Sequence, residues 1–587
     1  MLFRSDQEKA FDRVDWDFMQ STLSTMGFGP SFISWVNLFY KRVQSAVNVN
    51  GYLSPFFYLS RGVRQGCPLS PLLYVLVSEV LAVNIRCNPR ISGLTLPGSP
   101  PLSPISQYAD DTSLIVSSDD SIKAAFETYD LYEKASGSKL NRGKSKGLWL
   151  GSWRGRCDPP VDLDWSSVKL KVLGVFIGIG DLIEDNWRPR INAVDKVLSS
   201  WRSRSLSLRG KSLVINALAL SRIWYVASLV FMPPQVMHEL CTLVFNFFWS
   251  GKRDLVSRTV VVQAPSFGGF SVVDVKLKVW SLLAQWVKRF ASSRSGWVSF
   301  MSFWFQLSLS AAPFDVFSAP YSFRLGDLPP FYKALLVAWR ELGGGFSAPR
   351  SSLVFGSADP LFCTPVCSMS TKSCYLYLLS ERLVDPHCVE KFTPVFGVLY
   401  WRTTWRSLSF FDVDRQVIDL NWKIAHGVLY TAERLSSFGL SVPQACFCGT
   451  SLETLSHLFF ICPLAQSVLS WLQSLMFSFS PMSPVLLTRH SLFGFDSDEL
   501  RATPRIFVYI LNVCKFSIWR SRNDFRFRGI QPGALSVIET VKARVKFNLP
   551  LFFKRFRSAR RQRYFHRQWG ARGVVASVAA GRLTLNL

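Results

Sequence analysis

The sequence predicts an α+β fold at the N-terminus, followed by a mainly helical and basic remainder. In residues 1–178, short apolar strands alternate with helices that carry apolar residues at helical spacing. From about residue 186 to 290 the pattern becomes helical, and tryptophans are interleaved with arginines and lysines. A group of cysteines near residue 450 stands apart from the sparse cysteines elsewhere and marks a small separate segment.

Composition restricts the class of protein and its partners. The chain has 587 residues, of which 48% are apolar, so it is long enough and apolar enough to form several buried cores. The net charge of +27 favours a polyanionic partner, with nucleic acid as the first candidate. The charged residues near Met1 are incompatible with a signal peptide, and Asn216 and Arg222 interrupt the longest apolar stretch, so we expect no membrane partner. Scattered cysteines indicate a reducing, intracellular compartment, either nucleus or cytoplasm.

The N-terminal elements follow one another in a regular order. We expect, in sequence, a strand over residues 3–5, a helix over 14–26 ended by Gly27, a hairpin of strands 47–49 and 56–59 around Asn50-Gly51, a helix that begins at Pro68 and Pro71, and a hairpin over 105–116. The turn of the last hairpin carries Ala109, Asp110 and Asp111, so two carboxylates lie side by side at its tip.

Adjacent carboxylates repel each other unless they are well solvated or a cation lies between them. Mg²⁺ suits such oxygen ligands because it keeps water and substrate phosphates in its coordination shell. An ordinary solvated turn is the alternative for Asp110 and Asp111 alone. Asp6, which ends a short apolar strand, would supply a third carboxylate from a neighbouring strand, and three acids at one sheet edge are hard to explain by solvation.

Three segments resemble, in order and at similar intervals, the palm motifs A, B and C of reverse transcriptases. They are Asp6-Gln7-Glu8-Lys9-Ala10-Phe11-Asp12, Arg64-Gln65-Gly66-Cys67-Pro68-Leu69-Ser70-Pro71 and Tyr108-Ala109-Asp110-Asp111. The second segment resembles the LINE-type, non-LTR retrotransposon branch, and group II intron and telomerase polymerases fit less well. Two further segments resemble the next two palm motifs: Leu140-Asn141 with Lys144-Ser145, and then Leu173-Gly174. The segment Leu208-Arg209-Gly210-Lys211 resembles the thumb of the same elements.

The resemblance implies roles for individual residues. Asp6, Asp110 and Asp111 become the catalytic carboxylates that bind two Mg²⁺ ions. Phe11 would lie under the sugar of the incoming dNTP and exclude a 2′-hydroxyl, although core packing is an alternative role, and Gln65 and Gly66 would approach the nucleotide and template. The thumb residues expected beside the duplex of RNA template and DNA primer or target are Arg202, Arg204, Arg209 and Lys211.

The cysteine group predicts one structural zinc ion. Cys446, Cys448, His457 and Cys462 provide three thiolates and an imidazole, which match a closed tetrahedral site with no position left for a catalytic water. The segment resembles the zinc-binding segment downstream of the polymerase in LINE-type proteins. Its first pair has only one residue between the cysteines, and buried cysteines with a surface histidine are the alternative.

The C-terminal region is strongly basic. From residue 541 to the end the chain has twelve basic residues and no acid, and residues 554–567 alternate basic with aromatic side chains. This composition could pair with phosphates and stack on bases, but it also fits a solvated helix or a nuclear-localisation patch.

We therefore expect five regions: a reverse transcriptase palm at 1–178, a helical thumb at 179–300, an unassigned linker or helical region at 301–390, a zinc-binding segment at 391–475 and a helical, basic region at 476–587. The predicted function is RNA-directed DNA synthesis by two-metal nucleotidyl transfer. We also expect the chain to lack the fingers and endonuclease of such elements. A non-catalytic nucleic-acid-binding remnant is the alternative.

Overall fold

A computed structural model describes residues 1–98, 100–293, 295–346, 353–356, 363–397, 399–408, 414–579 and 581–587. The chain forms two compact units. The first contains Met1–Arg190, Tyr225–Pro233 and Leu282–Ser370, and the second contains Ile191–Trp224, Pro234–Ser281 and Thr371–Leu587. The five regions expected from the sequence follow its motifs and patterns, whereas the two units follow contacts in the fold. The boundaries of the five regions therefore remain predictions.

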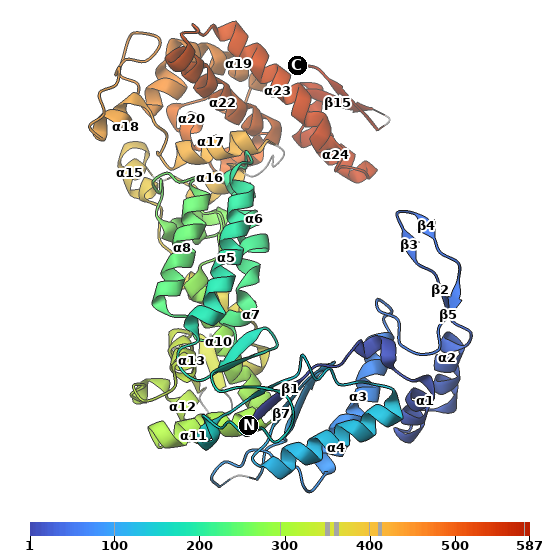
Figure 1. The fold of residues 1–587 in the computed structure, drawn as a ribbon. Helices are drawn as coiled ribbons and strands as arrows, with labels where there is room; N and C mark the ends of the chain where they lie inside the picture. The colour runs from blue at the N-terminus through green and yellow to red at the C-terminus, as the bar shows by residue number, and fades with distance from the viewer. Residues whose placement is uncertain are drawn as a thin grey trace. The chain divides into compact units, whose positions relative to one another are not determined.

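The centre of the first unit is a five-stranded sheet with the order β6-β7-β1-β8-β9. Its strands are β1 (Leu2–Ser5), β6 (Ile105–Tyr108), β7 (Asp111–Ile115), β8 (Lys146–Leu148) and β9 (Asp164–Ser166). Strand β1 pairs antiparallel with β7, beside which it lies in Figure 1, and with β8. Strands β8 and β9 are the parallel pair of this sheet. This sheet and its helices confirm the predicted α+β class.

Four helices accompany this sheet. Helices α3 (Ser70–Cys87) and α4 (Asp119–Ser136) share its core, α1 (Trp16–Thr25) packs against both of them, and α2 (Pro30–Tyr40) packs against α1. The buried ring of Phe3 on β1 contacts Phe126 on α4, with 5.2 Å between the ring centroids. Among the described helices, α3 alone has the length and composition of a membrane span. Its residues Leu81 and Ile85 are fully buried in the same core as Phe3, so α3 serves as a core helix of the sheet.

A protruding double hairpin follows α2. It contains β2 (Gln44–Ser45), β3 (Asn48–Val49), β4 (Tyr52–Leu53) and β5 (Phe57–Tyr58). The predicted turn at Asn50-Gly51 is confirmed, and both residues have positive φ, as a two-residue hairpin turn requires. The predicted pairing of strands 47–49 and 56–59 is wrong, because such a tight turn joins β3 directly to β4, and β5 pairs with β2 instead.

The rest of the first unit is a hairpin, several helices and a small sheet. These elements are β10 (Lys169–Val172), β11 (Val175–Gly178), α7 (Trp224–Ala227), α11 (Gly296–Leu309), α12 (Pro313–Ser318), α13 (Pro330–Glu341), β12 (Gly345–Phe346), β13 (Leu353–Gly356) and β14 (Cys363–Pro365). Helices α5 (Ile183–Arg202) and α10 (Val275–Ser292), and also α7 through Trp224, contribute residues to both units.

The second unit is largely helical. Its elements are α6 (Leu208–Val214), α8 (Pro234–Phe248), α9 (Arg258–Val262), α14 (Thr371–Ser380), α15 (His387–Phe396), α16 (Trp401–Leu408), α17 (Arg415–Ala425), α18 (Ala432–Ser437), α19 (Pro463–Phe479), α20 (Thr488–Phe493), α21 (Ser497–Ala502), α22 (Arg505–Arg528), α23 (Ala534–Phe553), α24 (Ala559–Gln568), β15 (Ala576–Ala579) and β16 (Arg582–Leu585). Helix α22 packs against α17, α19 and α23 and forms the buried centre of this unit.

Candidate active site and zinc centre

The three predicted catalytic acids come together at one end of the sheet. Asp6 directly follows β1, Asp111 begins β7, and Asp110 lies in the turn between β6 and β7. Because Ser5 on β1 is paired with Thr112 on β7, Asp6 leaves β1 at the end where β7 begins. All three acids are partly exposed, so their carboxylates are within reach of solvent and ligands.

The backbone of Asp6 is held in place by a neighbouring loop. Its N–H donates to the Ser145 hydroxyl at 3.2 Å, and its carbonyl accepts the Asn141 N–H at 2.8 Å. Asn141 and Ser145 belong to the segment that resembles the fourth palm motif of reverse transcriptases. This segment therefore fixes the direction in which the Asp6 side chain leaves the strand.

Only Asp111 of these acids has a positive partner among the described residues. The Arg4 guanidinium lies 3.0 Å from Asp111 Oδ1, and both side chains are about one-third exposed. Asp6 and Asp110 form no ion pair or side-chain hydrogen bond with the described part of the chain. Carboxylates that remain unneutralised beside one another are the donor set that fits Mg²⁺.

The end of the sheet that carries Asp6, Asp110 and Asp111, which we call the acid edge, is not a closed set of metal ligands. In the described residues, one group alone brings three or more potential metal-binding side chains within 4.8 Å of one another, and it is the cysteine–histidine cluster. Sequence reasoning could identify the acids but not the Arg4 partner, which lies 107 residues from Asp111.

Phe11 has a fixed position beside the acids. Its ring stacks on Tyr74 of α3, with centroids 4.7 Å apart and an interplanar angle of 13°. The Tyr74 hydroxyl donates to Gln7 Oε1 at 2.9 Å, which links α3 to the segment that follows Asp6. Phe11 is partly exposed, so it both packs against α3 and presents ring surface to solvent.

Gln65 and Gly66 lie in the exposed loop before α3. Gly66 has a φ of 87°, a conformation that side chains with a Cβ rarely adopt. The adjacent Arg64 donates to the Gln44 carbonyl at 2.6 Å, so the loop is tied to the double hairpin.

The four predicted nucleic-acid contacts differ in their environment. Arg202, Arg204 and Arg209 are exposed, and the Arg204 guanidinium lies 4.5 Å from the centroid of the Trp201 ring. Lys211 is partly buried instead. Its ammonium donates to the Phe248 carbonyl at 3.0 Å and to the Ser250 hydroxyl, and burial lowers its pKa.

The predicted zinc ligands form a compact cluster. The Sγ atoms of Cys446 and Cys462 are 3.9 Å apart, and Cys448 Sγ lies 3.3 Å from His457 Nε2. A tetrahedral ion with Zn–S bonds of about 2.3 Å separates two sulfurs by roughly 3.8 Å, so the donor set and its dimensions fit zinc. The four predicted ligands are thus brought together as a zinc site requires, and buried His457 excludes the alternative of a surface histidine.

The tight spacing of Cys446 and Cys448 is accommodated by a short turn. Cys446 N–H donates to the Ser451 carbonyl at 2.8 Å, and Gly449, with a φ of 77°, reverses the chain. Cys462 lies directly before α19, and its pKa is lowered by a hydrogen bond from the Cys446 thiol and by the first N–H groups of that helix. Both features favour a thiolate at this position.

A buried ion triad connects the cluster to α22. Glu453, immediately after the turn, is fully buried and lies 2.6 Å from Arg522 and 3.2 Å from Arg526. Arg526 also donates to the Ala445 carbonyl at 2.6 Å. Sequence reasoning missed this triad, because its members are separated by about seventy residues and no local motif joins them.

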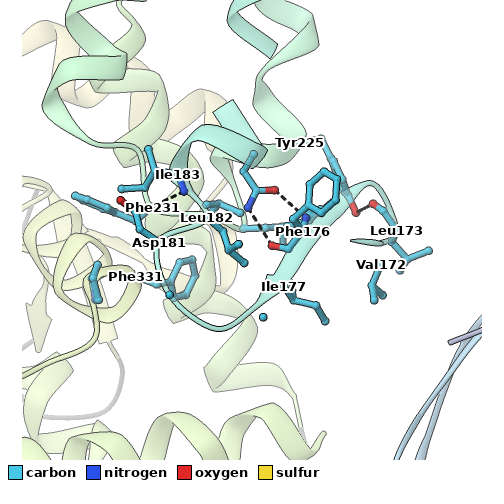
Figure 2. Close-up of a pocket in the computed structure, with 17 residues that line it drawn as sticks. Val172, Leu173, Phe176, Ile177, Asp181, Leu182, Ile183, Tyr225, Phe231 and Phe331 are labelled. Carbon is cyan, nitrogen blue, oxygen red and sulfur yellow. Dashed lines mark hydrogen bonds between the residues drawn. The ribbon is translucent and has the colours of Figure 1, made fainter. Parts of the chain in front are cut away.

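A cavity with none of these groups lies elsewhere in the first unit, beside β10 and β11. It has a volume of about 870 Å³ and is lined by apolar side chains that include Phe176, Ile177 and Phe331 (Figure 2). Asn186 fixes the hairpin by bonding both the N–H and the carbonyl of Phe176. None of the predicted site residues lines this cavity.

Comparison with known proteins identifies two segments. Residues 1–177 match the family model described as reverse transcriptase (RNA-dependent DNA polymerase), and residues 370–469 match the model described as zinc-binding in reverse transcriptase.

Three curated relatives are similar to this chain. The "Transposon TX1 uncharacterized 149 kDa protein" of Xenopus laevis is 31% identical over 57% of this chain and 26% of its own length. The "Retrovirus-related Pol polyprotein from type-2 retrotransposable element R2DM" of Drosophila melanogaster is 29% identical over 24% of this chain and 13% of its own length. The "Retrovirus-related Pol polyprotein from type-1 retrotransposable element R2" of Popillia japonica is 26% identical over 26% of this chain and 21% of its own length. The chain thus spans about a quarter or less of each relative.

Proposed function

We propose that this chain is a reverse transcriptase of the LINE type, from a non-LTR retrotransposon, and that it synthesises DNA on an RNA template by extending a DNA primer with dNTPs. The observation that carries the proposal is the position of Asp6, Asp110 and Asp111 at one end of β1 and β7. Three carboxylates with one basic neighbour are costly to hold together unless they bind cations.

Asp6, Asp110 and Asp111 would hold two Mg²⁺ ions at this edge. Bound there, the ions would stabilise charge on the attacking and leaving oxygens of an in-line phosphoryl displacement. The protein's own part is to fix the ligands: Ser145 and Asn141 hold the Asp6 backbone, and the tight turn between β6 and β7 presents Asp110.

Phe11 is proposed to select deoxyribonucleotides. Stacking on Tyr74 holds the ring in one orientation, and Tyr74 is itself anchored to Gln7. A ring fixed beside the acid edge would collide with a 2′-hydroxyl on the incoming nucleotide. Gln65 and Gly66, in the exposed loop before α3, are proposed to contact the nucleotide and template.

The basic residues are proposed to hold the primer–template duplex by its phosphates. Arg202, Arg204 and Arg209 are exposed and suited to this role, whereas Lys211 already donates to the Phe248 carbonyl, so we expect a smaller contribution from it. Cys446, Cys448, His457 and Cys462 would hold one structural zinc ion. Zinc bound there would crosslink the turn at Gly449 to the start of α19.

Primer extension by the purified chain tests the proposal. We expect Asp110→Asn to reduce the rate of extension by roughly a hundredfold or more without loss of bound zinc, because Asp110 contributes charge and no packing. The matched control is Asp130→Asn, an exposed acid on α4 that pairs with Arg142. Equal rates for the wild type and the Asp110 variant would reject the assignment.

The Arg4–Asp111 ion pair favours a second candidate function. An acid that is already neutralised by arginine would be a poorer cation ligand, as expected of a remnant that binds nucleic acid without catalysis. Wild-type chain that binds primer–template but never extends it would support this alternative.

A further inference from the structure

A second cavity lies within the second unit, between α6 and the pair α16 and α17. Its volume is about 590 Å³, within the range of ligand pockets of roughly 300–1,000 Å³. All of its lining residues belong to the same compact unit, so its walls are positioned by one fold. None of the predicted catalytic acids or zinc ligands contributes to it.

The chemistry of this cavity is apolar inside and cationic at its edge. Leu213, Ile418 and Phe270 supply apolar surface, and Leu213 is 65% exposed. Arg209 on α6 and Arg415 on α17 are the charged lining residues, and no acid lines the cavity. Neither guanidinium forms a hydrogen bond or ion pair within the described ranges, and both are exposed.

Two neutral polar side chains of the lining are already hydrogen-bonded within the protein. The Ser212 hydroxyl donates to the Phe270 carbonyl at 2.7 Å, and the Asn216 side chain bonds the Ser271 carbonyl and the Val273 N–H. The two guanidinium groups are the charged groups of the lining that remain to recognise a ligand. Two arginines beside an apolar hollow suit an anion attached to a flat apolar body.

The wall opposite α6 is rigid. The Gly268 carbonyl accepts hydrogen bonds from Trp422 Nε1 at 2.8 Å and from His426 Nε2 at 2.9 Å, which fixes the loop before Phe270 onto α17. Gly268 has a φ of 82°, and an added Cβ would lie 3.0 Å from the Trp405 ring. A cavity with a fixed wall does not have to be ordered by its ligand, which favours binding.

We propose that this cavity binds one unpaired nucleotide of a single-stranded nucleic acid, with the base in the apolar hollow and the adjoining phosphates at Arg209 and Arg415. The base must be unpaired, because bases in a duplex are stacked inside it and cannot enter a concave site. The net charge of +27 favours a polyanionic ligand over an acidic small molecule. Arg209 is shared with the contacts proposed for the primer–template duplex, whereas Arg415 and Leu213 belong to this cavity alone. Arg415→Ala and Leu213→Ala therefore test the cavity independently of the proposed function.

Fluorescence anisotropy in the absence of dNTPs tests the proposal on the full chain. The probes are a short labelled oligouridylate, the equivalent oligothymidylate and an abasic strand of the same length. We expect Arg209→Ala and Arg415→Ala each to weaken binding of all three and to reduce the salt dependence by about one ion. Arg501→Ala, an exposed arginine on α21 outside the cavity, is the charge-matched control and should change affinity less.

Leu213→Ala separates a base pocket from general electrostatic attraction. We expect it to weaken binding of the base-containing strands by about fivefold and to leave the abasic strand unchanged, because only a base contacts this side chain. Leu213 is largely exposed, so the variant should fold. Repeating the uridylate measurement with oligodeoxyuridylate, which lacks only the 2′-hydroxyl, identifies the strand as RNA or DNA.

Three results would overturn the proposal. They are equal binding of abasic and normal strands by the wild type, equal losses for Arg415→Ala and Arg501→Ala, and equal losses of the base-containing and abasic strands for Leu213→Ala. Photocrosslinking of a 4-thiouridine strand gives an independent readout. We expect crosslinks to α6, α16 or α17, and crosslinks confined to α24 would contradict the site.

Discussion

The cysteine–histidine cluster and the acid edge of the sheet are both sets of candidate metal ligands, yet the protein assembles them to different degrees. The cluster gathers four ligand atoms within 4.8 Å, and three of its four residues are buried. The acids lie at a partly exposed edge, and one of them is paired with Arg4. A ligand set completed by the protein suits a structural ion, whereas an open set leaves positions for substrate phosphates and water.

The surroundings of the two sets reinforce this difference. The cluster is linked through Glu453 to Arg522 and Arg526 on the central helix α22, so its geometry is part of the packing of the second unit. The acid edge is fixed through its backbone, and Asp6 and Asp110 keep free side chains among the described residues. We infer that zinc contributes to folding of the second unit, and that the acids acquire their ligands with the substrate.

The largest effect is expected when ligands are removed from the cysteine–histidine cluster, the ligand set that the protein completes by itself. Cys446→Ser combined with Cys462→Ser should abolish binding of one zinc ion per chain, because two of the four ligands are lost. Metal analysis by mass spectrometry measures this loss, and thermal unfolding should show a lower Tm for the second unit. Cys87→Ser, an exposed cysteine on α3, is the control. Full zinc content in the double variant would reject the cluster as a zinc site.

The next largest effect concerns the link between the cluster and α22. Glu453→Gln should lower the free energy of unfolding of the second unit by about 3–5 kcal/mol, because it leaves the buried Arg522 guanidinium without its charge partner. Chemical denaturation monitored by tryptophan fluorescence gives the value. Glu433→Gln, an exposed residue on α18, should change stability by less than about 0.5 kcal/mol. Equal small effects for both variants would mean that the triad is not coupled to folding.

The smallest effect is expected at the acid edge, where the ligand set is open. Arg4→Gln should lower the Mg²⁺ concentration for half-maximal primer extension by about two- to fivefold, because a partly exposed ion pair is worth up to about 1 kcal/mol and competes with the cation for Asp111. Arg13→Gln, which removes an ion pair of similar exposure with Glu8 and leaves the partner of Asp111 in place, is the control. A higher Mg²⁺ requirement for the Arg4 variant would show that Arg4 assists the site.

Features with a local cause could be predicted from the sequence. The turn at Asn50-Gly51, the hairpin tip at Asp110 and the end of α1 before Gly27 each follow from residue types within a few positions. The zinc ligands could be predicted because their spacing is short and their chemistry is specific. The meeting of Asp6 with Asp110 depended on the order of the resembling motifs, since sequence patterns alone do not pair β1 with β7.

Features that depend on long-range packing could not be predicted. The partners Arg4 for Asp111 and Arg522 for Glu453 lie far apart in the chain, and neither pair has a local pattern. The sequence predicts that Lys211 is one more exposed basic residue in a basic segment. In the fold, however, its ammonium donates a hydrogen bond to the Phe248 carbonyl. The cavity at Arg209 and Arg415 likewise exists only once α6 and α17 are packed together.

Metal occupancy with and without substrate tests the central contrast most directly. Mn²⁺ serves as the probe, since it prefers the same oxygen ligands as Mg²⁺ and is visible by electron paramagnetic resonance. We predict that the purified chain holds one zinc ion and binds Mn²⁺ weakly, and that Asp110-dependent tight binding of Mn²⁺ arises when primer–template and a dNTP are added. Tight, Asp110-dependent Mn²⁺ binding by the free chain, or a chain purified without zinc, would contradict the account.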